Sequence, residues 1–349
     1  MGSAPIRSAI AIDVGTTNTR ARFLLEGRVL KTTRRSVGIR DAIGSSGRDT
    51  LAVALRDAIE EVVKGTTQTM PDVMVASGML TSEVGLVHVP HVPTPAGKDE
   101  LARGAILQRV PAVADQPILF IPGVRTRTSE GEDGWASADL MRGEECETLG
   151  AWETLEAESS WEPGRSEVGP PRDTSTRCVF LWPGSHTKLV EVDDGKIVQS
   201  HTTLTGELTM ALARHTLLSA SLPAEFPNEP DPKALEMGVR LEAREGLGRA
   251  AFLVRIAAIT DELSEEERAS FLIGAVLADD VNHLVRHPMF GRARRVWVGG
   301  RQPQRTIYAE LLQKKNRGSV MEIGPELSEE ASARGALAIA IRYQELRRE

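Results

Sequence analysis

One pattern of strands and glycine turns occurs twice in this chain, and it constrains the fold more than any other feature. The first copy has an apolar run at residues 9–12, a loop around Gly15, an apolar run at 21–25 and a turn at Gly27. In the second copy Gly184 and Gly195 take these places, 11 positions apart where Gly15 and Gly27 are 12 apart. The copies lie 169 positions apart in a chain of 349 residues. The pattern therefore predicts two similar halves, each with its own strand–loop–strand unit.

The loop of the first copy has the composition of a phosphate site. Asp13 ends the first apolar run, and Gly15, Thr16, Thr17 and Asn18 follow it. The carboxylate can hold Mg²⁺ through water, while glycine lets backbone N–H groups and threonine hydroxyls approach phosphate oxygens closely. An ordinary hairpin is the alternative, because short Asp–Gly turns are common. The second copy favours the phosphate site.

Composition limits the remaining function classes. A length of 349 residues with 41% hydrophobic content predicts two domains. The formal charge of −7 excludes nucleic acid as the main partner, since phosphate neutralisation needs a basic face. The two cysteines, Cys146 and Cys178, lack disulfide or zinc spacing, which predicts a reducing compartment. Without an apolar stretch of membrane-spanning length or a signal-peptide core, we expect a cytoplasmic protein with no membrane partner.

Periodicity and turn residues place further elements along the chain. We expect a buried strand at 73–76, whose following loop at 77–82 is either a substrate contact or a plain turn. Residues 153–176, rich in Glu, Ser, Pro and Gly, predict a flexible insertion or linker. Helices are expected at 49–64, 139–151, 205–218, 247–260, 271–287, 307–314 and 328–347, and strands at 117–121, 295–298 and 320–323.

Three segments, 140–145, 183–188 and 205–208, together with 13–18 and 78–79, resemble the 2-dehydro-3-deoxygalactonokinase family of the acetate and sugar kinase, heat-shock ATPase and actin superfamily. The similarity spans nearly the whole chain. It implies transfer of the γ-phosphate of ATP to the 6-hydroxyl of 2-dehydro-3-deoxy-D-galactonate, in the De Ley–Doudoroff route of galactose or galactonate breakdown. Two positions depart from the family pattern, which has Trp where Val14 and Leu189 stand here.

The resemblance also implies an α/β fold with two ribonuclease H-like (actin-like ATPase) domains and an active-site cleft between them. We expect an N-terminal domain at 1–140 and a connecting helix with the insertion at 141–176. A C-terminal domain at 177–327 and a helix at the domain junction, 328–349, complete this prediction.

In a kinase of this kind, Asp13 would serve the metal, and Gly15, Thr16, Thr17 and Asn18 the β and γ phosphates. Lys188 would offset developing charge. His186 either contacts phosphate or caps a turn. The second phosphate cradle would consist of Gly184, Ser185, His186 and Thr187. Gly299 and Gly300 fit an adenine-side loop, or else a sharp turn.

For the acceptor, Arg142 is the expected ligand of the sugar-acid carboxylate; the alternative is that it pairs with Glu144, Glu145 or another carboxylate to hold the domain junction. Glu144 or Glu145 would take the proton of the attacking hydroxyl. Glu207 contacts sugar hydroxyls or serves only as a helix-dipole partner, and Gly78 and Met79 are further candidate substrate contacts.

Two alternative functions stay open on the sequence. A kinase of the same superfamily could act on another small sugar or sugar acid, which Val14 and Leu189 would favour. A nucleotide-switched scaffold, like the chaperone and actin branches, is a third class. The oligomeric state is open, with a homodimer among the alternatives.

Overall fold

The computed structural model describes residues 5–43, 47–64, 66, 70–128, 130–131, 133–160, 177–293, 295–315 and 319–349. The chain divides into two compact units. The first comprises Met1–Thr176, Val192–Ser200 and Glu326–Glu349, and the second Arg177–Glu191 and His201–Pro325. Among the residues described, no helix combines the length and the apolar content needed to span a bilayer.

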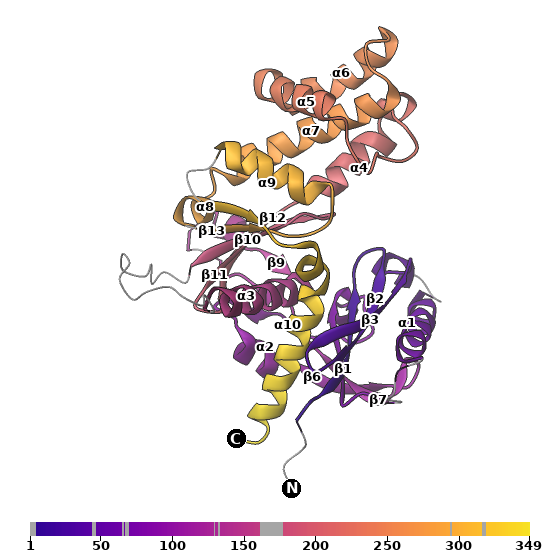
Figure 1. The fold of residues 1–349 in the computed structure, drawn as a ribbon, viewed down its shortest axis with the longest axis vertical. Helices are drawn as coiled ribbons and strands as arrows, with labels where there is room; N and C mark the ends of the chain where they lie inside the picture. Colours follow the sequence, from indigo (N-terminus) through magenta and orange to yellow (C-terminus); the bar gives the residue numbers. More distant parts are fainter. Residues whose placement is uncertain are drawn as a thin grey trace. The chain divides into compact units, whose positions relative to one another are not determined.

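The first unit is built on a six-stranded sheet of order β3-β2-β1-β4-β7-β6. Strands β1, β2 and β3 form an antiparallel meander (Figure 1). Strand β4 runs parallel to β1, and β7 runs parallel to β4. Edge strand β6 is antiparallel to β7. The six strands are β1 (Ser8–Val14), β2 (Thr19–Leu25), β3 (Arg28–Arg35), β4 (Val73–Gly78), β6 (Ile106–Val110) and β7 (Ala114–Phe120).

Alternation along the strands gives the first sheet two different faces. Ile10 and Ile12 point to one face and pack with Leu51 and Leu55 of α1 (Gly47–Val63) in an apolar core. The other face carries Asp13, together with Arg22 on the neighbouring strand. This polar face receives α10 (Pro325–Leu346), because the Arg22 guanidinium donates to the carbonyl of Glu329.

Helix α10 packs against α3 (Glu144–Ser160) through small residues. A Cβ on Gly335 would lie 2.0 Å from the carbonyl oxygen of Cys146, and one on Gly150 would lie 2.1 Å from that of Ala331. Only glycine permits this approach at either position. Short elements complete the unit: α2 (Lys98–Gly104) and a small sheet of β5 (Val92–Pro93), β8 (Val124–Arg125) and β9 (Leu140–Met141).

The second sheet repeats the strand order of the first, β12-β11-β10-β13-β14, with β13 parallel to both β10 and β14. In the order in which its strands follow along the chain, each sheet places its third, second and first strands side by side and then adds two parallel strands; the first sheet has β6 in addition at its edge. The five strands are β10 (Cys178–Trp182), β11 (Thr187–Asp193), β12 (Lys196–Thr203), β13 (Arg295–Val298) and β14 (Ser319–Glu322).

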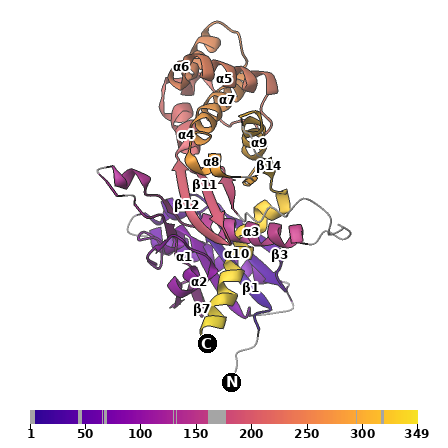
Figure 2. The same ribbon diagram turned by 90° about the vertical axis from the view of Figure 1, so that its left-hand side faces the viewer.

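Helices α5, α6 and α7 form a group of their own in the second unit (Figures 1 and 2). Gly238 and Gly274 let α5 and α7 touch, since a Cβ on either would lie 2.1 Å from a backbone oxygen of the other helix. Helices α7 and α9 also share an apolar core with the sheet. The α-helices in the described part of this unit are α4 (Thr205–His215), α5 (Pro232–Glu245), α6 (Leu247–Ile259), α7 (Glu265–Leu284), α8 (Pro288–Arg292) and α9 (Gln304–Lys315).

Most expected elements are confirmed with ends shifted by a few residues, and strand β13 matches the expected residues 295–298. Two expectations near the centre of the chain are wrong. Residues 140–141 are a strand rather than part of a helix, and α3 continues through 153–160, which the sequence predicted as flexible. The rest of that predicted insertion, 161–176, lies outside the described residues. The four-part domain division stays a prediction; in the structure both α3 and α10 belong to the first unit.

Candidate active site

Backbone hydrogen bonds fix the loop between β1 and β2. The Gly15 N–H donates to the Asn18 carbonyl at 2.9 Å, and the N–H groups of Ile39 and Arg40 donate to the carbonyls of Gly15 and Thr16 at 3.0 and 3.1 Å. The loop carbonyls are therefore turned into the fold. Thr17 and Asn18 are exposed, so the loop has hydroxyl and amide groups on its outer side for a phosphate.

Two glycines, Gly78 and Gly143, lie next to one oxygen of the Asp13 carboxylate. Gly78 has φ +77°, and a Cβ there would lie 2.9 Å from Asp13 Oδ1 and 2.5 Å from the Val14 carbonyl oxygen. Gly143, with φ +117°, packs on Gly78 in turn, its Cβ position 3.3 Å from the Gly78 Cα. Arg20 Nη1 lies 3.5 Å from Asp13 Oδ2. One carboxylate oxygen thus faces bare backbone and the other an arginine.

The first turn of α3 carries three acidic residues, and one of them, Glu147, lies close enough to Asp13 for their charges to interact. Both oxygens of Glu145 accept the Gly143 N–H, at 2.9 and 2.7 Å, and Glu145 is completely buried. Burial and then the charge of Glu144 raise the pKa of Glu145 to about 8. Burial and then the charge of Asp13 raise the pKa of Glu147 to about 8 as well. Glu144 is only partly buried, and its Oε2 accepts the Arg142 N–H at 3.1 Å.

Both terminal nitrogens of the Arg142 guanidinium make hydrogen bonds within the first unit, where the sequence predicted a ligand for the substrate carboxylate. Its Nη1 donates to the carbonyl and the hydroxyl of Thr81, at 2.8 and 2.6 Å. Its Nη2 donates to the Val89 carbonyl at 3.0 Å and lies 3.1 Å from His91 Nδ1. The Thr81 hydroxyl also donates to the carbonyl of Gly78. Arg142 therefore holds the turn beside Asp13, a role that its position in the sequence did not reveal.

The turn that follows β4 contributes backbone rather than side chains. The Met79 side chain packs against the apolar core beneath α1. Gly78 lies at the carboxyl end of β4, beside Val14 at the end of β1. Of the two expected substrate contacts in this turn, the structure places Gly78 next to Asp13 and directs the Met79 side chain into the core.

The loop between β10 and β11 is supported by the start of α4. Gly184 and Ser185 are exposed. A Cβ on Gly206 would lie 2.1 Å from the Gly184 carbonyl oxygen, and the Glu207 N–H donates to the Ser185 carbonyl at 3.0 Å. His186 Nε2 lies 3.6 Å from Glu207 Oε1. Residues 184–186 and Glu207, which are far apart in the sequence, thus form one cluster.

Thr187 and Lys188 are less accessible than the sequence implied. The Thr187 side chain is buried, and its hydroxyl lies 3.1 Å from the Tyr308 hydroxyl. Lys188 is 5% exposed, and its Nζ donates to the Thr202 hydroxyl at 2.7 Å. Both side chains therefore make contacts behind the loop.

Gly299 and Gly300 lie against the start of the same loop. The Gly299 N–H donates to the Leu181 carbonyl at 2.9 Å, and a Cβ on Gly299 would lie 2.0 Å from the Trp182 ring. Gly300 has φ +84°, and a Cβ there would lie 3.0 Å from the Pro183 carbonyl oxygen. The structure brings this predicted adenine-side loop next to the second phosphate loop.

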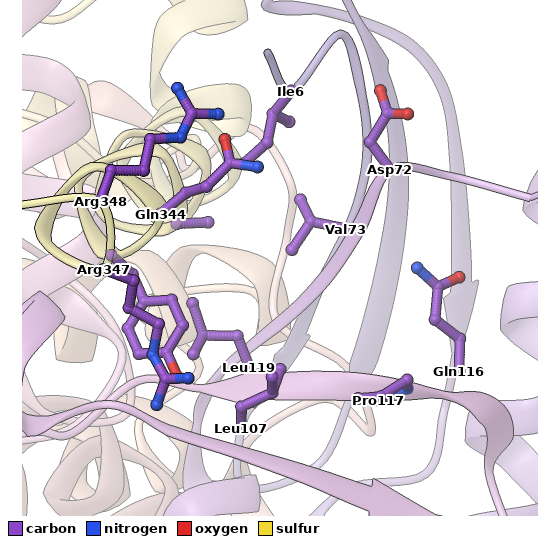
Figure 3. Close-up of a pocket in the computed structure, with 12 residues that line it drawn as sticks. Ile6, Asp72, Val73, Leu107, Gln116, Pro117, Leu119, Gln344, Arg347 and Arg348 are labelled. Carbon is purple, nitrogen blue, oxygen red and sulfur yellow. The ribbon is translucent and has the colours of Figure 1, made fainter. Parts of the chain in front are cut away.

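A cavity of about 610 Å³ lies elsewhere in the first unit (Figure 3). Ile6, Asp72 and Val73 line it at the starts of β1 and β4, and Gln344 of α10 and Arg347 just after that helix line it as well. Asp13 and Gly78 are at the opposite ends of these two parallel strands. The cavity is therefore separate from the predicted phosphate site.

Sequence reasoning missed several residues that shape these loops. A Cβ on Gly38 would lie 2.5 Å from the Thr17 N, and Gly143 and Gly206 make the close backbone contacts described above. Glu147 has the raised pKa described above. Gly143 and Gly206 lie within segments 140–145 and 205–208, which carry the resemblance to the family, so these two glycines could have been identified from the sequence. Gly38 offered none, because its contact depends on the path of the chain after β3.

Two sheets with the same order of their first strands, each with a glycine-containing loop between its first two strands, define the actin-like ATPase class of α/β proteins. Sugar kinases are one branch of this class. The model of the 2-keto-3-deoxy-galactonokinase family matches residues 13–339, and the chain belongs to that family. It is therefore an enzyme, a kinase.

Known relatives agree with this assignment. The chain is 27% identical to the 2-dehydro-3-deoxygalactonokinase of Escherichia coli (strain K12) over 277 residues, 78% of each chain. It is 28% identical to a protein of Rhizobium meliloti (strain 1021), named as a probable 2-dehydro-3-deoxygalactonokinase, over 60% of this chain and 57% of that one. A crystal structure from Sinorhizobium meliloti, with a provisional assignment to the same activity, has the same fold: TM-score 0.71, 22% identity and 95% coverage of both chains.

Proposed function

We propose that this kinase transfers the γ-phosphate of ATP to the 6-hydroxyl of 2-dehydro-3-deoxy-D-galactonate, a step of galactonate and galactose breakdown by the De Ley–Doudoroff route in the cytoplasm. The family description and both relatives name this sugar acid. The observation that supports phosphoryl transfer most directly is the Asp13 carboxylate with its bare backbone surroundings at Gly78 and Gly143. Such a site lets a phosphate and its metal approach Asp13 Oδ1 over bare backbone.

The donor set at Asp13 fits Mg²⁺. This ion is commonly bound by one or two carboxylates and completes its shell with water and substrate phosphates. Among the described residues no group of three acidic, histidine or cysteine side chains could hold a metal by itself, which fits a metal that binds together with ATP. Asp13 would hold the ion, which when bound neutralises charge on the phosphate oxygens. Gly15, Thr16, Thr17 and Asn18 would contact the phosphates.

Glu144 is the better candidate for the general base. A base must come within hydrogen-bond distance of the proton it removes, and Glu145 is completely buried with both oxygens on the Gly143 N–H. Glu144 is partly exposed on the same helical turn. We propose that Glu144 accepts the hydroxyl proton and that Glu145 fixes the start of α3.

Within the second unit, Gly184, Ser185 and His186 would contact the phosphates, with His186 oriented by Glu207. Lys188 would act through its charge from behind the loop, since its ammonium group is bonded to Thr202. We propose that the exposed backbone of Gly299 and Gly300 lies against the adenine.

The departures from the family pattern do not favour another acceptor. Val14 and Leu189 are both completely buried, in the apolar cores of the first and second units respectively. Side chains in these positions have no access to a bound sugar acid. No observation therefore supports a second candidate function.

A coupled kinase assay over a set of 2-keto-3-deoxy acids tests the proposal. We expect turnover with 2-dehydro-3-deoxy-D-galactonate to exceed turnover with its C4 epimer, and ³¹P NMR to show a 6-phosphate ester. Faster turnover with another acid would show that this acid, and not 2-dehydro-3-deoxy-D-galactonate, is the acceptor. ATP hydrolysis that no sugar acid stimulates would instead favour the scaffold class.

A further inference from the structure

A group of buried hydroxyls lies behind the second phosphate loop. Tyr308 on α9 donates its hydroxyl proton to Asp280 on α7. The same phenol oxygen lies 3.1 Å from the Thr187 hydroxyl on β11 and also interacts with the Thr205 side chain at the start of α4. All four residues are buried, with exposures of 1 to 6%. The group therefore joins four elements of the second unit out of contact with solvent.

The direction of these hydrogen bonds follows from Asp280. The phenol proton is donated to Asp280, so the phenol oxygen can only accept further hydrogen bonds. The Thr187 hydroxyl must then donate to that oxygen. Burial and the charge of Asp280 raise the pKa of Tyr308 well above its usual value, so the phenol keeps its proton.

The two threonines belong to the segments that hold the phosphate loop. Thr187 is the first residue after loop residues 183–186, and Thr205 begins the helix on which the loop rests. That helix touches the loop through Gly206, against the Gly184 carbonyl, and through the hydrogen bond from Glu207 to Ser185. A single phenol oxygen thus connects the end of the loop to its support.

We propose that Tyr308, held by Asp280, is a positioning residue that fixes loop 183–186 for phosphate binding through Thr187 and Thr205. The inference rests on the proposed function, because it assumes that this loop binds the phosphates of ATP. The hydroxyl of Thr187 then serves as an anchor for the loop rather than as a phosphate ligand.

The test is calorimetric titration of the full chain with Mg·ATP in the absence of acceptor. Tyr308→Phe removes one oxygen and leaves the ring in the core, and we expect the Kd for ATP to rise about 10-fold. Thr187→Val leaves the Tyr308–Asp280 bond in place, and we expect a similar rise. If Tyr308 acts through Thr187, the double variant binds ATP within about twofold of either single variant. The acceptor KM at saturating ATP stays unchanged.

The matched control is Tyr343→Phe, the same change at the other of the two tyrosines in the chain, on α10. It leaves the Kd for ATP unchanged. A lower melting temperature of Tyr308→Phe with an unchanged Kd would overturn the inference, as would losses that multiply in the double variant. If Tyr308→Phe does not fold, an unchanged Kd in Thr187→Val is sufficient to overturn it. A wild-type chain that binds ATP without phosphorylating the sugar acid overturns only the proposed acceptor, whereas a failure to bind ATP overturns both proposals.

Discussion

Glu145→Gln tests how the buried start of α3 responds to pH. In the folded chain the pKa of Glu145 rises from an ordinary value of 4.5 to about 8 because the carboxyl is buried and lies beside Glu144. Between these two values the folded chain binds more protons than the unfolded chain. The stabilisation is therefore fully present below pH 4.5 and is lost as the pH rises through 8.

The size of the effect follows from the two pKa values. Each pH unit between 4.5 and about 8 corresponds to about 1.4 kcal/mol. Glu145 alone would therefore lower the free energy of unfolding by up to about 5 kcal/mol across this range. The glutamine amide of the variant would keep an oxygen to accept the Gly143 N–H but cannot ionise. The variant should therefore match the wild type near pH 5 and exceed its stability near pH 9.

Urea unfolding at pH 5, 6, 7, 8 and 9, followed by tryptophan fluorescence, measures this difference. Trp152 on α3 is a suitable reporter, because its ring packs against Gly195 within the first unit. Glu153→Gln on the same helix is the control, since Glu153 is partly exposed and pairs with Lys98; its pH dependence should follow the wild type. Equal pH dependence in Glu145→Gln and the wild type would refute the reasoning.

Three further changes probe the first unit. Asp13→Ala should lower turnover about 10²- to 10³-fold with little change in melting temperature, and more than about a tenth of wild-type turnover at saturating Mg²⁺ would contradict the metal assignment. Arg142→Lys should lower the free energy of unfolding, measured in urea, by about 2 to 4 kcal/mol, because the hydrogen bonds to Thr81 and its neighbours are lost. Unchanged stability with a raised acceptor KM would instead show that Arg142 binds the carboxylate of the sugar acid. Gly78→Ala forces a side chain into a backbone with φ +77° and to 2.5 Å from the Val14 carbonyl oxygen, so kcat/KM should fall at least about 100-fold, and near-normal kinetics would show that the turn can adjust.

Many of the strands can be predicted from local patterns in the sequence. Apolar runs of strand length, separated by turns at Gly27 and Gly195, define the repeated strands in both halves. The segment 295–298 is bounded by arginines before it and glycines after it, which sets both ends of β13. The ends of these strands depend on residues that are adjacent in the sequence, so they can be predicted without the structure.

Helix α3 shows why a polar segment misled the sequence prediction. Periodicity identifies a helix by the contrast between its apolar and polar faces, but α3 packs against α10 through Gly150 and the backbone of Cys146. Contacts of this kind need small residues and leave no apolar stripe. Residues 153–160 therefore look like a linker although they are helical.

Roles in the candidate site depend on contacts between distant segments. Arg142 looks like a substrate ligand in its motif, yet its partners Thr81, Val89 and His91 lie 51 to 61 positions away. Thr187 looks like part of a phosphate cradle, yet its partner Tyr308 is 121 positions away. Motif letters mark such residues as important but do not say which way their side chains point.

The way the chain threads through its two units sets an order for their completion during synthesis. The second unit contains only residues between 177 and 325, whereas the first needs Glu326–Glu349 as well as Met1–Thr176 and Val192–Ser200. Until α10 leaves the ribosome, the Arg22 guanidinium lacks the Glu329 carbonyl, and the glycine surface of α3 at Gly150 has nothing packed on it. A chain truncated after residue 325 therefore contains every residue of the second unit but lacks α10 of the first, so the half of the enzyme that carries Asp13 is the last to be completed.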